Sequence, residues 1–308
     1  MGRRRTGLRI IIHGDKNASG GVTRTLSNRG AMPLDHPSWI PLYGYALTAL
    51  SFLCLLKWCL PRTNPFVFLG QCVRDHAARV HTMFYVSALL AIITLDILET
   101  RYDDAITRGL HWDFTPLLFR MEGSAARMFQ IFNCSALTYF LSVIYLYVFS
   151  VMGIVAVLAT YQLGEKTLGR KLFWATVLNY VLILPFYVLV PVTERWAVGD
   201  GEVKLLMNQI SPLLIQTLRP LSGLNNCFPS FHTSMAVTIA LILSQSASKR
   251  LRRTMYVLAA LVIYSTLYLG FHWILDVLAG VLFGAGCTYL ASAAVDKFRL
   301  EFVLYRTR

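Results

Sequence analysis

Two histidines, His232 and His272, stand at the ends of apolar runs, where a membrane helix would meet water. His272 is followed four residues later by Asp276. On a helix this spacing places the carboxylate beside the imidazole, where it can hold one ring N–H. A histidine oriented in this way can attack phosphorus through its other ring nitrogen. The spacing therefore predicts a nucleophilic histidine.

The residues just before His232 suit the binding of an anion. Pro229 stands where a helix would begin, and Ser230 follows it. Proline at the first helical position leaves backbone N–H groups that point outward, and such groups can cradle a phosphate. We expect this segment and the His272 segment to face each other across one site.

Composition places the chain among multispanning membrane proteins. Of its 308 residues 56% are hydrophobic and 15% are charged, which is too apolar for an ordinary soluble domain. The net charge of +13 comes from basic residues in loops and tails, so a nucleic-acid partner is not expected. The six cysteines show no metal-ligand spacing and are interpreted as small apolar residues. We expect no metal and no cofactor.

The predicted fold is an all-α, polytopic membrane helix bundle of six to seven transmembrane helices with an interfacial amphipathic helix. Residues 1–38 are predicted to be a disordered basic leader, residues 39–296 the membrane-embedded domain, and residues 297–308 a basic cytoplasmic tail. Because a span needs roughly 20 apolar residues, the expected spans are about 40–60, 83–98, 135–161, 172–191, 230–244, 255–269 and 273–294.

Two segments between the spans carry further expectations. Residues 114–132 have apolar side chains near helical spacing with charges between them, and are predicted to lie flat in the interface, where they could cover or admit a lipid. A short helix is expected around residues 203–218. Glu194 is interpreted as an interfacial cap. Three aromatic residues near the second histidine are expected to form an interface belt: Tyr268, Phe271 and Trp273.

Loop charge gives the expected orientation. The 166–171 loop, the 249–253 cluster and the tail are basic, and the positive-inside rule makes their side cytoplasmic. The site then lies on the external or lumenal face. With seven spans the arginine-rich leader would also lie outside, so either Met32 is the physiological start or one span, the short second one, does not cross.

The two histidine segments resemble motifs of the type-2 phosphatidic acid phosphatase superfamily. PSFHT at residues 229–233 resembles its second motif, and HWILD at residues 272–276 resembles the end of its third. The arginine of the third motif is absent, with Thr266 in its place. PVTER, which ends at Arg195, is similar to a segment of the inositol phosphorylceramide synthase branch, as is the pattern that runs from Tyr268 through Asp276.

The resemblance implies a role for each matching residue. His272 is the nucleophile that forms a phosphohistidine, and Asp276 fixes its tautomer. His232 is the general acid for the leaving oxygen and then the base for the acceptor. Arg195 and Ser230 bind the phosphoryl oxygens. No metal is required by this mechanism.

The expected function is that of an integral membrane lipid phosphatase or phosphotransferase that acts on a phospholipid headgroup, with inositol-phosphate-type transfer as the main reading. Fewer positive charges than usual leave room for a diester, which favours transfer. The alternative is a monoester phosphatase of phosphatidic acid or polyprenyl phosphate type. Two further hypotheses are that the protein is not an enzyme. It could be a transporter with a His/Asp proton relay, or a noncatalytic scaffold. The expected partners are a membrane lipid substrate and the bilayer.

Overall fold

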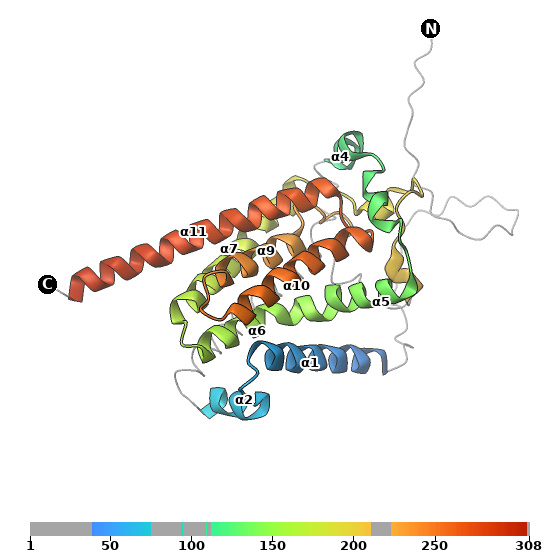
Figure 1. The fold of residues 1–308 in the computed structure, drawn as a ribbon. Helices are drawn as coiled ribbons and strands as arrows, with labels where there is room; N and C mark the ends of the chain where they lie inside the picture. Colours follow the sequence, from blue (N-terminus) through green and yellow to red (C-terminus); the bar gives the residue numbers. More distant parts are fainter. Residues whose placement is uncertain (1–38, 75–93, 95–108, 110–111, 211–222, 307–308) are drawn as a thin grey trace, which may run out of the picture.

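A computed structural model describes residues 39–74, 94, 109, 112–210 and 223–306. Within these residues the regular structure is helical, and the long helices run side by side in a bundle (Figure 1). They are α1 (Trp39–Cys59), α5 (Ser135–Val143), α6 (Phe149–Gln162), α7 (Lys166–Leu189), α9 (Phe231–Leu243), α10 (Lys249–Tyr268) and α11 (Ile274–Arg306). The predicted all-α membrane bundle is confirmed.

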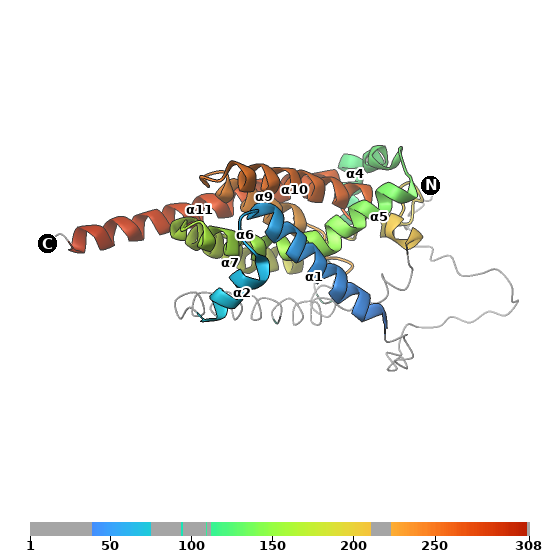
Figure 2. The same cartoon turned by 60° about the horizontal axis from the view of Figure 1, so that its bottom comes forward.

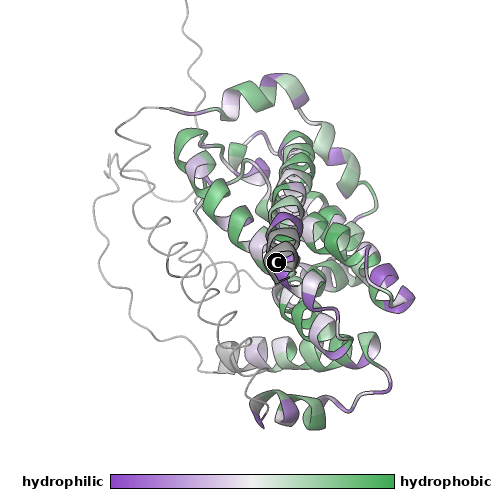
Figure 3. Cartoon of the chain, turned by 90° about the vertical axis from the view of Figure 1, so that its left-hand side faces the viewer, coloured by the Kyte–Doolittle hydropathy of each residue, from purple (hydrophilic) through white to green (hydrophobic). Residues whose placement is uncertain are grey.

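Among the described residues, three helical stretches are long and apolar enough to cross a membrane: 135–162, 166–189 and 274–297. Shorter apolar helices cover 43–59 and 231–243. Most of the bundle consists of hydrophobic residues (Figure 3). This is expected where helices face lipid as well as each other. The chain is therefore treated as an integral membrane protein. The predicted second span, 83–98, falls outside the described residues apart from Thr94.

Several helices extend beyond the apolar runs that predicted them. α7 begins at Lys166 rather than near residue 172, and α10 begins at Lys249 rather than near residue 255. For α10 the cause is a cap, because the Ser248 side chain accepts a hydrogen bond from Leu251 N. α11 continues as a helix to Arg306, so part of the predicted tail prolongs the last span well beyond the other helices (Figures 1 and 2). Hydropathy locates the apolar part of a helix and not its polar ends.

The predicted third span contains a π-helical turn, η2 (Ile144–Val148), between α5 and α6. The turn is closed by a hydrogen bond from Phe149 N to Ile144 O, five residues back. A π turn inserts one extra residue into a helix and is often found at functional sites. It lies level with the two histidine segments, as the aromatic contacts described below show.

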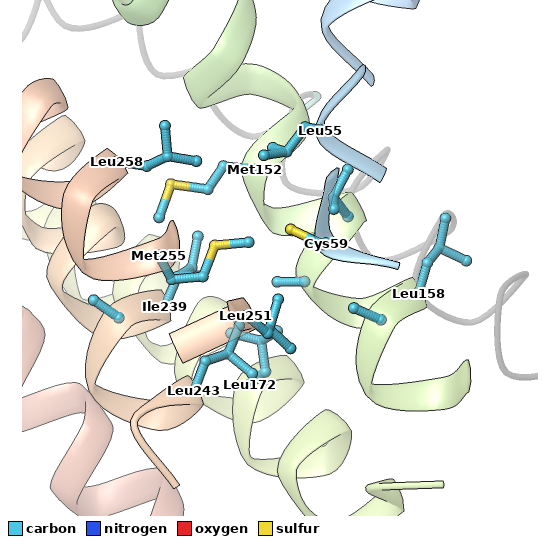
Figure 4. Close-up of a cluster of buried hydrophobic side chains, with 14 of the residues drawn as sticks. Leu55, Cys59, Met152, Leu158, Leu172, Ile239, Leu243, Leu251, Met255 and Leu258 are labelled. Carbon is cyan, nitrogen blue, oxygen red and sulfur yellow. The ribbon is translucent and has the colours of Figure 1, made fainter. Parts of the chain in front are cut away.

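The main hydrophobic core joins α1, α6, α9 and α10. Met152, Ile239 and Met255 meet at its centre, and Leu55 and Cys59 of α1 close one side (Figure 4). Met152 and Met255 are fully buried, and their unbranched side chains can fill irregular gaps between helices. The helix α1 crosses the others obliquely (Figure 2), and is followed by the short helix α2 (Pro65–Arg74).

The segment predicted to lie in the membrane interface is found across one end of the bundle. It consists of α4 (Thr115–Glu122) and the 3-10 helix η1 (Ala125–Gln130), which stand near the start of α11 (Figure 1). Gly123 separates them with a φ of 57°, a conformation that favours glycine. The described part of the range 203–218, where a short helix is expected, contains the 3-10 turn η4 (Leu206–Gln209). The rest of that range, from residue 211 on, lies outside the described residues.

Close packing between α9 and α11 brings the two histidine segments together. A Cβ on Gly280 would lie 2.6 Å from Ser230 O, and one on Gly284 would lie 2.3 Å from Ser234 O. Only glycine permits that approach. The buried hydroxyl of Thr238 also donates to Gly284 O at 3.1 Å. The N-terminal ends of α9 and α11 are thereby held against each other.

Candidate active site

Ser230 caps the helix that carries His232. Its side chain accepts a hydrogen bond from Thr233 N at 3.4 Å, and α9 begins at Phe231. Pro229 therefore lies before the cap and not at the first helical position, which corrects the sequence prediction. Ser230 is fully buried, and its backbone N donates to Asp276 O at 3.1 Å. The cap thus belongs to the contact between the two segments.

The contact between His272 and Asp276 predicted from their spacing is present. Nδ1 of His272 lies 3.2 Å from Oδ2 of Asp276, and both side chains are buried. The two residues do not share a helix, because α11 begins at Ile274. The carboxylate instead folds back from the first turn of α11 and also accepts from Trp273 N at 2.9 Å. The imidazole is held through Nδ1, which leaves Nε2 to react.

Cys227 is a member of this cluster that the sequence interpretation missed. Its thiol donates to Oδ2 of Asp276 at 2.8 Å, and its Sγ lies 3.4 Å from Nδ1 of His272. Burial, followed by the negative charge of Asp276, raises the pKa of the Cys227 thiol well above its usual value. The residue is therefore a neutral hydrogen-bond donor. The sequence feature that could have indicated this role is its position, two residues before Pro229 and next to the motif that carries His232.

Backbone hydrogen bonds join three loops behind the site. Val192 forms an isolated parallel bridge with Asn226, through Val192 N to Asn225 O and Cys227 N to Val192 O. Arg195 N donates to Phe271 O at 3.0 Å. The loop after α7 therefore lies between the two histidine loops and fixes their relative positions.

His232 and His272 line the same cavity, and their ring centroids are 6.1 Å apart. The cavity has a volume of about 220 Å³. The other lining residues come from η2, from α7, from the starts of α6 and α9, and from loops: Tyr145, Phe149, Tyr180, Ile183, Leu184, Tyr187, Glu194, Gly223, Asn226, Cys227 and Phe231. Two histidines thus face a largely apolar and aromatic space.

Arg195 and Ser230 are close to the site but are not among the described residues that line the cavity. The Arg195 guanidinium is fully buried and pairs with both carboxylate oxygens of Asp200, at 3.0 and 2.7 Å. It also donates to Gly123 O at 3.2 Å and lies 4.9 Å over the Trp273 ring. Phosphate binding by Arg195 would require a different arrangement of its side chain and stays a prediction.

Glu194 faces the cavity in place of the expected arginine. Its side chain is buried and accepts a hydrogen bond from Trp196 Nε1. The sequence interpretation as an interfacial cap does not describe this position, because hydropathy does not tell which side of a loop turns inward. Acceptor groups on a substrate would be repelled by an ionised carboxylate here, whereas a hydroxyl or a protonated phosphate oxygen could donate to it.

The expected aromatic belt is wrong for the three residues near His272. Tyr268 and Trp273 are fully buried and Phe271 is nearly so. Trp273 Nε1 donates to Thr193 O at 2.9 Å, and the Tyr268 hydroxyl lies 3.0 Å from that of Thr138. Both polar atoms have found protein partners, as buried aromatics usually do. These rings support the nucleophile loop.

The Asp276 carboxylate controls the protonation of His272. Burial lowers the pKa of the imidazole, but the charge and the hydrogen bond of Asp276 outweigh burial, so the pKa of His272 is raised above its usual value. Glu122 supports the same helix end, since its Oε2 accepts from Leu275 N at 3.0 Å. Burial raises the pKa of Glu122. A helix N-terminus favours such an acceptor.

Cys227, His272 and Asp276 are also the one described group that could hold a metal ion by geometry, with ligand atoms within 4.8 Å of one another. The hydrogen bonds among them account for the same arrangement with protons in place of an ion.

Comparison with known proteins supports the superfamily resemblance. The PAP2 superfamily model matches residues 174–300, a range that contains Arg195 and both histidine segments. Undecaprenyl-diphosphatase of Sulfolobus acidocaldarius is 28% identical over 134 residues, which is 40% of this chain. The matched part spans 64% of the length of that relative. The inositol phosphorylceramide synthase branch gains no support from these findings.

Among solved structures, the chain is similar to LpxE of Aquifex aeolicus. The TM-score is 0.45 and the sequence identity 22%. The similarity covers 56% of this chain and 94% of that chain.

Proposed function

We propose that the protein is an integral membrane phosphatase that removes a phosphoryl group from a lipid phosphate. The observation that carries the proposal is the pair of histidines on one cavity, one of them held through Nδ1 by a buried carboxylate. The family match over these residues and the undecaprenyl-diphosphatase relative support a phosphatase acting on a lipid phosphate. They favour the monoester or diphosphate reading over inositol-phosphate headgroup transfer, which has no support.

The residues suggest the following steps. Nε2 of His272 attacks phosphorus while Nδ1–H keeps its hydrogen bond to the Asp276 carboxylate. The bond from phosphorus to the oxygen on the lipid side then breaks. His232 donates a proton to that oxygen. Water then attacks the phosphohistidine, His232 accepts its proton, and the P–N bond breaks to release phosphate. Backbone N–H groups at the start of α9 support the transferring oxygens.

A site at one end of the helices agrees with this chemistry better than with the rival transporter. His232, His272 and Asp276 all lie at the starts of α9 and α11. A proton relay would need titratable groups along a path through the membrane midplane. We propose that the cavity opens on the non-cytoplasmic face, as the loop charges indicate.

The test supplies purified protein in detergent with phosphatidic acid, a polyprenyl phosphate and a polyprenyl diphosphate. Phosphatidylinositol with an alcohol acceptor is run in parallel. We expect phosphate release from one of the first three and no product from the last. His272→Ala should abolish release, and rapid denaturation of the wild type at alkaline pH, where a P–N bond survives, should trap label from the substrate's phosphoryl group on His272. Headgroup transfer without phosphate release, or full activity of His272→Ala, would contradict the proposal.

A further inference from the structure

A column of four aromatic rings connects the two histidine segments. The Phe271 ring is stacked on Tyr145, with centroids 4.8 Å apart and an interplanar angle of 3°. Tyr145 is stacked in turn on His232, at 4.2 Å and 17°. Phe149 covers His232 at 4.5 Å and 37°. His232 therefore contacts two rings, and one of them, Tyr145, also stacks on Phe271, the residue before His272.

The π-helical turn η2 supplies this arrangement. Tyr145 lies within the turn and Phe149 follows it directly, at the end of the hydrogen bond from Phe149 N to Ile144 O. Both rings line the cavity. Tyr145 also packs against the buried cluster that includes Leu141 and Leu205. Its ring thus has packing contacts besides the stack, and the π turn sets its place along the helix.

We infer that Tyr145 is a positioning residue, which holds His232 at its working distance from His272. The inference rests on the proposed function of His232 as general acid. The Tyr145 ring stacks on Phe271 and also on His232. These two contacts set the spacing between the loop that carries His272 and the helix start that carries His232. The imidazole can slide within its plane but cannot tilt without losing contact with Tyr145 or Phe149. A proton donor needs such control, since its proton must reach the leaving oxygen.

One test follows His232 directly and does not need a substrate. Diethyl pyrocarbonate modifies accessible imidazoles, and mass spectrometry of the purified protein gives the rate at His232. We expect Tyr145→Leu to raise this rate several-fold, since one face of the imidazole loses its cover. Tyr145→Phe keeps the ring and should match the wild type. Tyr139→Leu is the matched control, because Tyr139 is 52% exposed on the preceding helix.

A second test separates proton donation from a general loss of structure. With a lipid phosphate, Tyr145→Leu should lower kcat by about tenfold or more and leave KM nearly unchanged. The comparison with p-nitrophenyl phosphate is made in the step that forms the phosphohistidine, measured by rapid quenching in alkali, because His232 also serves the later hydrolysis of that intermediate. In this first step the loss should be much smaller than with the lipid phosphate, because p-nitrophenolate leaves without a proton. Equal losses on both substrates would overturn the inference, as would a Tyr145→Phe variant as impaired as Tyr145→Leu.

The outcomes distinguish this inference from the proposed function. If the wild type hydrolyses no phosphate ester, the proposed function fails, and the modification rate at His232 still tests the stack. An unchanged rate in Tyr145→Leu overturns the stack whatever the activity. Should Tyr145→Leu lower the Tm of the protein, Tyr145→Met is measured in its place, since the flexible methionine fills more of the space.

Discussion

Arg195 and Asp200 are joined by two parallel N–H···O bonds, of 3.0 Å to Oδ1 and 2.7 Å to Oδ2. The arginine side chain is fully buried, and the Asp200 side chain is 20% exposed. The guanidinium also lies against the ring of Trp273, directly after the proposed nucleophile. The pair therefore ties the loop after α7 to the loop of His272, in addition to any contact that Arg195 makes with phosphate.

Removing one partner of this pair should cost more than removing both. Asp200→Ala leaves a buried guanidinium without its counter-ion, which typically costs about 3–5 kcal/mol. Since Asp200 is partly exposed, we expect the lower end of that range. The double variant Arg195→Met/Asp200→Ala should be more stable than Asp200→Ala alone. Thermal unfolding of the wild type, both single variants and the double variant in the same detergent checks this order. Strictly additive changes would show that the two residues act independently.

Asp276→Asn should move the acidic limb of the pH–rate profile to lower pH. Attack requires a neutral imidazole, and the Asp276 carboxylate raises the pKa of His272 above 6.5 despite burial. Activity of the wild type should therefore rise with pH through a value above 6.5. Asparagine lacks the negative charge, so the pKa of His272 falls and the acidic limb moves to lower pH. In addition, kcat should drop by about 10²-fold or more because the tautomer of His272 is no longer fixed. The profile of kcat/KM measures both effects, and an unshifted limb would contradict them.

The same pair makes a prediction for stability. A histidine whose folded pKa is raised contributes stability that is fully present below its unfolded pKa and is lost as pH rises through the folded pKa. The stabilisation due to the raised pKa of His272 is therefore greatest in acid. Asp276→Asn should lower the Tm more at pH 5 than at pH 8. An equal loss at both values would mean that the ion pair adds nothing to stability.

Cys227 should act through its hydrogen bond and not as a reactive thiol. Its Sγ lies 2.8 Å from Oδ2 of Asp276, and its raised pKa keeps it protonated. Cys227→Ser preserves a donor and should retain most activity. Cys227→Val removes the donor and should lower kcat by about tenfold, in line with a lost hydrogen bond to a charged group at ~1.5 kcal/mol. Cys287→Ser, a buried cysteine of α11, is the control. Equal losses in Cys227→Ser and Cys227→Val would exclude the donor role.

The sequence was sufficient for the parts of the molecule that depend on composition and short spacing. Apolar runs predicted α1, α7, α9 and α11 because each run covers most of the apolar part of its helix, and one long run predicted the stretch from α5 to α6. The contact of His272 with Asp276 followed from residues four apart. The segment around His232 also met this pair as expected, since both stand at the ends of apolar helices.

Contacts between distant segments were harder to predict. Cys227 joins Asp276, and Tyr145 joins His232, across dozens of residues that give no periodic signal. The π turn that positions Tyr145 has no composition of its own within an apolar run. The pair of Arg195 with Asp200 is different, because its partners stand only five residues apart in one loop. Such a short spacing of opposite charges is visible in the sequence and could have predicted the ion pair.

Gly284→Ala should separate the helices that carry the two histidine segments. A Cβ at this position would lie 2.3 Å from Ser234 O, a backbone atom that cannot move without shifting α9. Overpacking of this kind typically costs about 1–3 kcal/mol, so the Tm should fall, and activity should fall with it as His232 moves from His272. Gly286→Ala is the matched control on the same helix, since nothing lies within 4 Å of its Cβ. There alanine should raise stability by about 0.5–1 kcal/mol through helix propensity. Equal behaviour of the two variants would show that the close contact of α9 with α11 does not hold the site together.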